Sequence, residues 1–389
     1  MISKIKILSL FLLSLLFIAA QCNSPKEEPK AVDETTNSEI TNSKSAEVLQ
    51  VGAERLDAYL SKLKNKNIAL LVNQTSVVGN EHLVDVLLKN DVSIKKIFAP
   101  EHGFRGQADA GEKVKDGKDA KTGIPLISLY GKNKKPTAEH LSGIDLVVFD
   151  IQDVGARFYT YISSMSYVME ACAENDVAFM VLDRPNPNGH YIDGPILKED
   201  YSSFVGLHPI PVVHGMTVGE YAQMVNGEGW LRNGVKCNLT VIRCGNYDHQ
   251  TFYDLPIKPS PNLPNLTSIY LYPSLCFFEG TTASIGRGTN TQFQVIGHPD
   301  FQQGGYNFTP VSMAGAKYPK HENKKCNGFD LTELPHSEFQ ERGQLNLNYL
   351  IQFYKNFPNK KSFFLENKFF DKLAAVSYTH LTLPTICSV

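Results

Sequence analysis

The sequence predicts an α/β protein in which a Rossmann-like parallel-sheet domain is followed by a smaller α+β auxiliary domain. Short apolar runs rich in β-branched residues alternate with helical patterns, which is typical of a parallel sheet covered on both faces. A polar cluster follows nearly every apolar run. After about residue 255 the sequence becomes proline-rich, which indicates a boundary between the two domains.

The composition is that of an ordinary globular protein. The chain has 389 residues, of which 42% are hydrophobic and 20% are charged. Its 38 Lys and Arg residues against 40 Asp and Glu residues leave a net charge of −2, which argues against a nucleic-acid binder. The seven cysteines form no Cys-x-x-Cys pair and have no regular spacing, so neither a zinc site nor a disulfide scaffold is expected.

Residues 1–22 are expected to be a signal peptide that directs export. Two lysines precede an apolar run over residues 7–20, which is short for a stable transmembrane helix. The run ends in Ala-Ala-Gln-Cys, which resembles a bacterial lipobox in which Cys22 becomes the lipidated N-terminus. Gln21 departs from the small residue usual before that cysteine, and simple secretion by a different cleavage is the alternative.

Two further terminal segments are expected to lie outside the folded domains. Residues 23–48 are rich in Ser, Glu, Lys, Thr and Pro and poor in apolar groups, so they predict a flexible linker. Residues 376–389 look like translated sequencing-adapter read-through, which indicates a non-native tail. A genuine Thr-rich β tail is the alternative interpretation.

The first domain is expected over residues 49–255. Apolar runs predict strands at residues 68–72, 94–99, 146–149, 178–182 and 212–213. Helical patterns follow at residues 81–89, at 159–175 and up to about residue 227. Parallel sheets bind ligands at the carboxyl ends of their strands, which is where the polar clusters of this sequence fall. The strands are followed by neither a Gly-x-Gly-x-x-Gly pattern nor a Walker loop, so no nucleotide is expected.

The auxiliary domain is expected over residues 265–375. Pro256, Pro259, Pro261 and Pro264 make the preceding stretch too proline-rich for a helix, which indicates a linker. Short strands and loops are expected beyond this linker, in a domain that closes over the first.

Glu101 is the first candidate for chemistry, because it lies in a Pro-Glu-His-Gly sequence directly after a predicted buried strand. Burial favours the neutral form of a carboxyl group, which suits a general acid. The alternative is a structural or helix-capping carboxylate.

A second cluster follows the strand at residues 146–149. Asp150 and Asp153 alternate sides if the strand continues through them, and Arg157 could pair with either in a structural salt bridge. Arg157 and Arg105 could instead clamp a substrate carboxylate, because a guanidinium group binds carboxylates through two parallel hydrogen bonds.

Aromatic and acidic side chains complete the candidates. Tyr159 and Tyr161 suit stacking on sugar rings, although tyrosines at the start of a helix often only pack. The Asp183–Asn188 stretch, with Asp183, Arg184 and Asn186, combines candidate site residues with ordinary turn chemistry. Glu279, before a Gly-Thr pair and near Arg287, is the strongest acidic candidate of the auxiliary domain.

The candidate residues favour glycoside hydrolysis over other chemistry. His102 and His214 fit no metal-ligand spacing, so neither a metal nor another cofactor is expected. Serines occur in no Gly-x-Ser-x-Gly elbow, which argues against a serine hydrolase. Paired carboxyl groups, arginines and aromatic rings are typical of glycosidases, in which the separation of the two carboxyl groups sets the stereochemical outcome.

Five motifs carry a resemblance to a known family. They lie at residues 73–75, 98–106, 149–161, 182–187 and 273–281. They resemble the NamZ family of exo-acting β-N-acetylmuramidases, long catalogued as a domain of unknown function. The resemblance covers about residues 50–375. Family members continue well beyond residue 373, so this sequence is expected to lack the native terminal helices.

The resemblance implies an active cleft between the two domains and release of N-acetylmuramic acid from the non-reducing ends of peptidoglycan fragments, without a metal. Glu101 is expected to be the acid, with Asp153, Glu279 or a tyrosine as its partner. The lactyl carboxylate of the sugar gives the arginines a purpose. The expected substrate-binding residues are Asn73, His102, Arg105, Asp150, Arg157, Tyr159, Tyr161, Asp183, Arg184, Asn186, His214 and Arg287.

The combined expectation is an exported bacterial lipoprotein, periplasmic or associated with the outer membrane, that acts on peptidoglycan-derived muropeptides or disaccharides. Its partners are these fragments and, through a lipid on Cys22, the membrane, but no nucleic acid. Two other classes of protein remain open: a glycan-binding lipoprotein without catalysis, and a cell-wall amidase or esterase. Mutating Glu101 tests the first, because a binder should keep its affinity and show no turnover before or after the change. Product analysis tests the second, because an amidase or esterase leaves the glycosidic bond intact.

Overall fold

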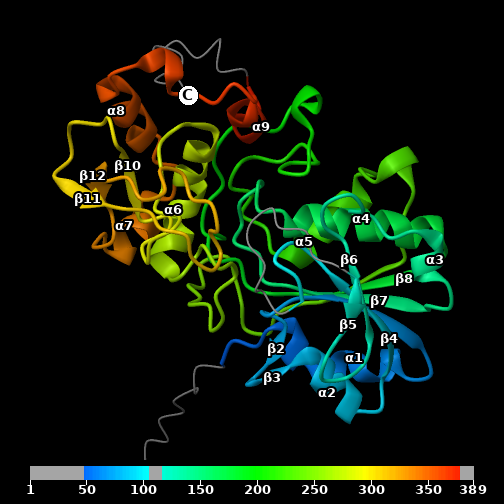
Figure 1. The fold of residues 1–389 in the computed structure, drawn as a ribbon. Helices are drawn as coiled ribbons and strands as arrows, with labels where there is room; N and C mark the ends of the chain where they lie inside the picture. Colours follow the sequence, from blue (N-terminus) through cyan, green and yellow to red (C-terminus); the bar gives the residue numbers. More distant parts are fainter. Residues whose placement is uncertain (1–47, 105–115, 377–389) are drawn as a thin grey trace, which may run out of the picture. The chain divides into compact units, whose positions relative to one another are not determined.

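The structure is a computed structural model that describes residues 48–104 and 116–376 (Figure 1). The described residues belong to one compact unit. Several predictions lie outside the described residues. They are the signal peptide with Cys22, residues 23–47 of the predicted linker, the candidate Arg105, and residues 377–389 of the predicted tail. Within the described part, no helix is both long enough and apolar enough to cross a membrane.

A seven-stranded sheet forms the first region, with the strand order β5-β6-β4-β1-β7-β8-β9. Its strands are β1 (Asn67–Val72), β4 (Ser93–Ala99), β5 (Gly117–Lys118), β6 (Pro125–Ser128), β7 (Leu146–Asp150), β8 (Ala178–Leu182) and β9 (Leu239–Ile242). Neighbouring strands are parallel except β5 and β6. The parallel strands, counted in chain order, lie in the order 3-2-1-4-5-6 of a doubly wound Rossmann-type sheet, which confirms the predicted α/β fold class.

Helices cover both faces of this sheet, as near-continuous apolar strands require. In β1, Ile68, Leu70 and Val72 pack in one apolar cluster with α1 (Leu56–Leu63) and α2 (Leu83–Lys89). The alternate residues Ala69 and Leu71 belong to a second cluster, with α3 (Ala138–Leu141), α4 (Tyr161–Glu174) and α5 (Val218–Gly227). Figure 1 shows α1 and α2 on one side of the sheet and α4 and α5 on the other.

One predicted strand is absent from the sheet. Val213 forms only isolated bridges, to Ala156 and Asp193, so residues 212–213 belong to a crossing of loops. The last parallel position is taken instead by β9, which pairs with β8. A small hairpin of β2 (Val77–Val78) and β3 (Glu81–His82) leads into α2.

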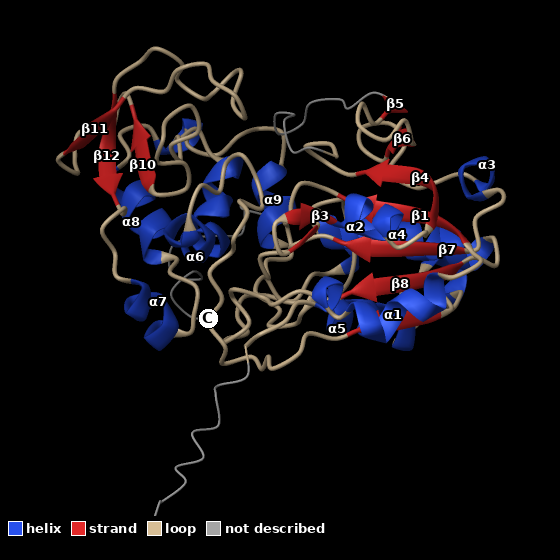
Figure 2. Ribbon diagram, turned by 90° about the horizontal axis from the view of Figure 1, so that it is seen from below, coloured by secondary structure: helices blue, strands red, loops and turns tan. Residues whose placement is uncertain are grey.

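The second region combines a three-stranded antiparallel sheet with helices, as expected of an α+β unit (Figure 2). Its strands are β10 (Val295–His298), β11 (Tyr306–Phe308) and β12 (Cys326–Asp330). Its helices are α6 (Leu266–Leu275), α7 (His336–Arg342), α8 (Asn348–Asn356) and α9 (Phe369–Ala374). Short 3₁₀ turns occur in both regions. They are η1 (Gly52–Glu54), η2 (Glu199–Tyr201) and η3 (Arg232–Gly234) in the first, and η4 (Cys276–Gly280) and η5 (Lys360–Ser362) in the second.

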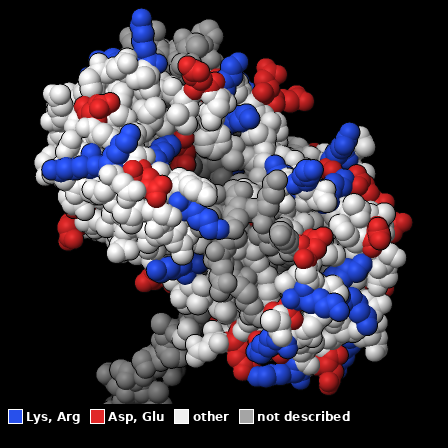
Figure 3. Space-filling view, viewed as in Figure 1, with Lys and Arg blue, Asp and Glu red and all other residues white. Residues whose placement is uncertain are grey.

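The two regions share one apolar core. The cluster on the α4 and α5 face of the large sheet continues without a break into the second region, where it includes Phe278 and Phe353. Phe158 joins them, with its ring 5.5 Å from that of Tyr272 and 5.7 Å from that of Phe277. On the molecular face seen in Figure 3, charges of both signs are interspersed, and the described surface there shows no large patch of one sign.

Candidate active site

A pocket of about 290 Å³ brings the two regions together at the carboxyl end of the large sheet. From the first region it is lined by Glu101, His102, Tyr130, Phe158, Tyr159, Thr160, Tyr161, Phe204 and Val205. From the proline-rich stretch onward it is lined by Ser260, Asn262, Leu263, Tyr272, Cys276, Glu279, Arg287, Phe293, Phe369 and Leu373. The volume suits a small ligand such as one substituted sugar ring, and two carboxyl groups lie on its walls.

Glu101 enters the pocket from a tight turn that follows β4. The Gly103 amide donates to the Pro100 carbonyl over 3.0 Å, and His102 and Gly103 both have a left-handed backbone, with φ of 67° and 76°. Such backbone strain in a non-glycine residue is often found at functional sites. The Glu101 carboxyl accepts hydrogen bonds from the hydroxyls of Tyr130 at 2.9 Å and Thr160 at 2.7 Å, which fixes its orientation.

Tyr159 and Tyr161 form an aromatic wall beside Glu101. Their rings meet edge to face with centroids 5.0 Å apart, and both hydroxyls donate to the Pro259 carbonyl, at 2.8 and 3.4 Å. Burial raises the pKa of both phenols, so both remain neutral. The proline-rich stretch is therefore part of the pocket, where Ser260 also lies 3.4 Å from Nε2 of His102.

Glu279 also lines the pocket, from η4 directly after α6. Its carboxylate accepts from Nε of Arg287 at 2.7 Å. Lys320 is beside this pair, and its ammonium group donates to four backbone carbonyls between residues 278 and 283, at 2.6 to 3.4 Å. Burial raises the pKa of Glu279, but Arg287 and Lys320 outweigh that effect and hold it below its ordinary value. Glu279 is therefore ionised, and Lys320 is a functional candidate that no sequence pattern predicts.

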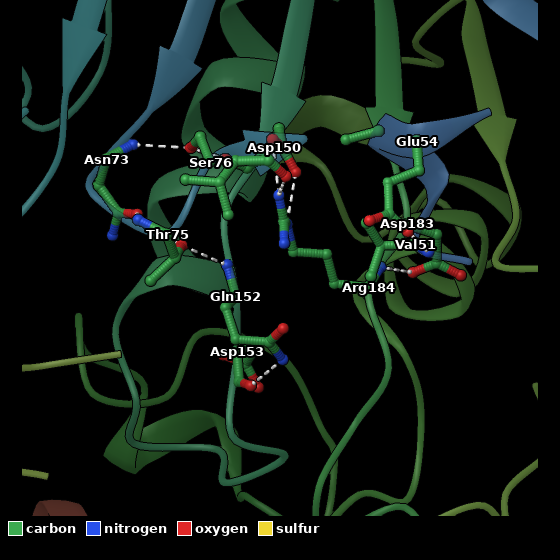
Figure 4. A network of polar contacts seen from close by, with 12 residues as sticks. Val51, Glu54, Asn73, Thr75, Ser76, Asp150, Gln152, Asp153, Asp183 and Arg184 are labelled. Atoms are coloured by element: carbon green, nitrogen blue, oxygen red, sulfur yellow. Dashed lines mark hydrogen bonds and ion pairs between the residues drawn. The ribbon is translucent and has the colours of Figure 1, made fainter. Parts of the chain in front are cut away.

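Polar residues at the ends of β1, β7 and β8 form a network of hydrogen bonds and ion pairs (Figure 4). Arg184 pairs with Asp150 through two hydrogen bonds, of 2.5 and 2.9 Å, and both side chains are buried. Asn73 accepts from the amide and hydroxyl of Thr75, at 2.9 and 2.6 Å. These predicted substrate-binding residues lie at the topological switch point between β1 and β7, yet their side chains join strand ends and do not line the pocket.

Asp183 and Asn186 organise the turn before α5. Asp183 accepts from the Thr217 hydroxyl and the Gly219 amide, both at 2.8 Å, and burial raises its pKa to about 6. Asn186 donates to the Met216 carbonyl at 2.9 Å. Both therefore hold the backbone between β8 and α5, and neither lines the pocket.

Asp153 and His214 form a buried pair close to the two tyrosines. Oδ2 of Asp153 accepts from the Gly155 amide at 2.6 Å and lies 3.8 Å from Nε2 of His214. Among the described residues, Oδ1 of Asp153 and Nε2 of His214 have no hydrogen-bond partner. Burial raises the pKa of Asp153 to about 7 and lowers that of His214 to about 4, so both are largely neutral between about pH 4 and pH 7.

The structure places Arg157 differently from the sequence expectation. Its guanidinium donates to the carbonyls of Pro195 at 2.6 Å, Ile210 at 2.9 Å and Leu373 at 2.9 Å, and pairs with neither Asp150 nor Asp153. Burial lowers its pKa to about 10. Both terminal nitrogens of Arg157 donate to backbone oxygens. Through the Leu373 carbonyl, Arg157 connects the loop after β7 to α9.

Over residues 48–104 and 116–376, no group of three or more His, Cys, Asp or Glu side chains could hold a metal ion. Of the predicted site residues, the pocket brings together Glu101, His102, Tyr159, Tyr161, Glu279 and Arg287. Residues that the sequence patterns do not single out, such as Asn262, Tyr272 and Phe369, complete its walls.

A doubly wound α/β fold with two carboxyl groups in a sugar-sized aromatic pocket defines a glycosidase-like protein. The family model described as exo-beta-N-acetylmuramidase NamZ, N-terminal, matches residues 68–267, and the C-terminal model matches residues 270–383. The chain belongs to this family. The second match extends beyond residue 376, where the predicted tail begins.

Individual proteins give the same relationship. The chain is 41% identical over 346 residues to the peptidoglycan beta-N-acetylmuramidase NamZ of Bacillus subtilis (strain 168), covering 84% of this chain and 82% of that protein. It also resembles a crystal structure of a DUF1343 family protein from Bacteroides fragilis NCTC 9343, with a TM-score of 0.79, 52% identity and coverage of 85% and 89%. A second DUF1343 protein of that organism has a TM-score of 0.70, 29% identity and coverage of 85% and 90%.

Proposed function

We propose that this chain is an exo-acting glycosidase that releases N-acetylmuramic acid from the non-reducing ends of peptidoglycan fragments, with Glu101 as its general acid. The observation that carries the proposal is the position of Glu101. It is a carboxyl group held by two hydroxyls on the wall of a sugar-sized pocket, in a member of the exo-β-N-acetylmuramidase family. The related Bacillus subtilis protein, by its name, is a peptidoglycan β-N-acetylmuramidase.

The proposed reaction follows ordinary glycoside hydrolysis. The terminal sugar enters the pocket, and Glu101 gives its proton to the glycosidic oxygen as the bond to the anomeric carbon breaks. Water then adds to the anomeric carbon and releases a proton to the solvent, from which the Glu101 carboxylate is protonated again, and free N-acetylmuramic acid and a shortened fragment result. Tyr159, Tyr161 and Tyr272 line the pocket, and their rings supply apolar surface against the sugar. Burial raises the pKa of all three hydroxyls, so these side chains stay uncharged.

The other two predicted catalytic carboxyl groups differ in their access to the sugar. Glu279 lines the pocket and is ionised, but its charge is shared with Arg287. Asp153 lies behind the tyrosines and is outside the pocket lining. Replacing Glu279 is therefore expected to affect the reacting sugar more directly than replacing Asp153.

Glu101→Gln tests the proposal, because glutamine keeps the size of the side chain and one acceptor oxygen but cannot give a proton to the glycosidic oxygen. The substrate is a disaccharide of N-acetylmuramic acid β-linked to N-acetylglucosamine, and the product is followed by mass spectrometry. We expect release by the wild type and a loss of about 100-fold or more in the variant. Glu228→Gln, at an exposed position after α5, is the matched control and should retain full activity. No release by folded wild-type protein would overturn the glycosidase proposal, and unchanged release by Glu101→Gln would remove Glu101 as the acid.

We also propose that the chain is exported and anchored to a bacterial membrane through a lipid on Cys22, at the periplasmic or outer-membrane side. Lys4, Lys6 and the apolar run over residues 7–20 support export, and the position of Cys22 supports lipidation. Cys22→Ser should move the protein from the membrane fraction to the soluble fraction. Gln21→Ser, which restores a small residue before the cysteine, should stay in the membrane fraction. Equal fractionation of Cys22→Ser and wild type would contradict the anchor.

A further inference from the structure

Arg287 differs from the other arginines near the pocket because part of its guanidinium group is available to a ligand. Its Nε donates to Glu279, and within the described ranges it makes no other hydrogen bond, which leaves both Nη groups for an acceptor. Its side chain is 26% exposed and lines the pocket. Arg157 and Arg184, by contrast, are buried and use their terminal nitrogens on backbone carbonyls and on Asp150.

The charges around Arg287 do not balance locally. Among the described groups that shift the pKa of Glu279, Arg287 and Lys320 are two cations, so two positive charges face its one carboxylate. Since Lys320 is enclosed by four backbone carbonyls, its ammonium group has little freedom to move away from this wall. An anion bound at Arg287 would compensate the extra positive charge, and a water-depleted pocket strengthens that attraction.

The guanidinium group is also held in a fixed orientation. Glu279 fixes its Nε, and the ring of Phe293 lies beneath it, with the guanidinium carbon 5.2 Å from the ring centroid. A planar fork of donors held in this way loses little freedom on binding, and its geometry matches a carboxylate.

We infer that Arg287, positioned by Glu279 and Phe293, binds the lactyl carboxylate of the terminal N-acetylmuramic acid and thereby selects this sugar against uncharged amino sugars. The inference rests on the proposed function and adds the residue that determines its specificity. Apolar side chains on the same pocket, from Leu263, Phe369 and Leu373, can accept the methyl groups of the lactyl and acetyl substituents.

The first experiment changes the substrate and leaves the protein intact. Three 4-methylumbelliferyl β-glycosides are compared: N-acetylmuramic acid, the same sugar with its lactyl carboxylate converted to a primary amide, and N-acetylglucosamine. A charge-assisted hydrogen bond predicts that wild-type kcat/KM is about 10- to 100-fold higher for the acid than for the amide. Equal values for acid and amide would overturn the inference, whatever the variants do.

The second experiment changes Arg287. In Arg287→Gln the preference for acid over amide should fall to within about threefold, because the acid loses its partner while the amide retains its low rate. Arg287→Lys should restore part of the preference, since it restores the charge without the fork. Arg243→Gln, at an exposed position, is the matched control and should keep the wild-type preference. A variant that is slower on both substrates in equal proportion would show a structural role only and contradict the inference.

The two proposals fail in distinguishable ways. No turnover of any of the three glycosides by folded wild type would overturn the proposed function. Turnover of the acid that depends on Glu101 but shows no preference over the amide would keep the proposed function and remove Arg287 as the specificity residue.

Discussion

Three carboxyl groups show how neighbours decide the chemistry of one residue type. Burial raises the pKa of Asp153 to about 7 and that of Asp183 to about 6. Two nearby cations reverse the effect of burial at Glu279 and lower its pKa. Glu279 therefore remains an anion when the other two are partly neutral, so the pocket wall and the layer behind it carry different charges near neutral pH.

The raised pKa of Asp153 makes the fold less stable as the pH rises. Between about pH 4 and pH 7 the folded state keeps a proton that the unfolded chain releases, so the free energy of unfolding falls, by on the order of 4 kcal/mol at most. Asp153→Asn is neutral at every pH and removes this loss. We expect the variant to unfold several degrees above wild type at pH 8 and close to it at pH 5, as measured by thermal unfolding.

Burial lowers the pKa of the neighbouring His214, so its titration raises the free energy of unfolding as the pH rises. Wild type and Asp153→Asn both contain His214, so this contribution cancels to first order in the difference between them. Asp200→Asn, on an exposed turn, is the control and should show no such pH dependence. If Asp153→Asn were no more stable than wild type at pH 8, ionisation of this buried group would not be the cause.

The sequence predicted several pocket-lining residues correctly, but it did not predict which groups the buried arginines bind. The turn after β4 and the aromatic stretch near residue 279 are local features, and their residues do line the pocket. The partner of Arg157 could not be found in the same way, because its acceptor on Leu373 is 216 residues away along the chain. Asp150 likewise pairs with Arg184 across two neighbouring strands, which only the strand order reveals.

At the scale of elements, α9 forms part of the pocket because Gly280 lets it approach η4 closely. A Cβ atom on Gly280 would lie 2.5 Å from Cα of Phe370, which is backbone and cannot move aside alone. The same helix places Phe369 and Leu373 in the pocket wall. Arg157 fixes it from the other side through the Leu373 carbonyl.

Gly280→Ala should therefore separate α9 from η4. The backbone conformation of Gly280 is open to alanine, so the expected cost is the steric overlap, about 1–3 kcal/mol. We expect a lower melting temperature together with a raised KM, because Phe369 and Leu373 shift away from the sugar. Gly227→Ala, at the end of α5 with open space around its Cα, is the matched control and should be neutral or slightly stabilising.

Elements with a clear period were predictable and those set by tertiary contacts were not. Apolar runs predicted β1, β4, β7 and β8 within one residue at each end, because buried parallel strands are nearly all apolar. The pattern did not predict α6, since Pro273 lies inside it and its residues are buried on every side, which leaves no polar face. Its start is nonetheless marked by Asn265, which caps the Ser268 amide at 3.0 Å.

At the scale of the whole molecule, the continuous core indicates that the two regions unfold together. Domains that unfold separately have their own cores and contact each other through smaller interfaces. Here the apolar cluster on one face of the large sheet extends through Phe158 to Phe278 and Phe353. Function requires the same continuity, because Glu101 of the first region and Arg287 of the second line one pocket.

The full chain should consequently show one main calorimetric unfolding transition, and core mutations in either region should lower it as a whole. Phe158→Ala removes a ring at the junction, and Phe353→Ala removes one deep in the second region, where it stacks on Phe301 at 4.0 Å. Each should cost about 3–5 kcal/mol and lower the same transition. Phe252→Ala, at an exposed position, should change the temperature of this transition by no more than about a degree. Two resolved transitions, with Phe353→Ala lowering only one of them, would instead show that the regions fold as independent domains.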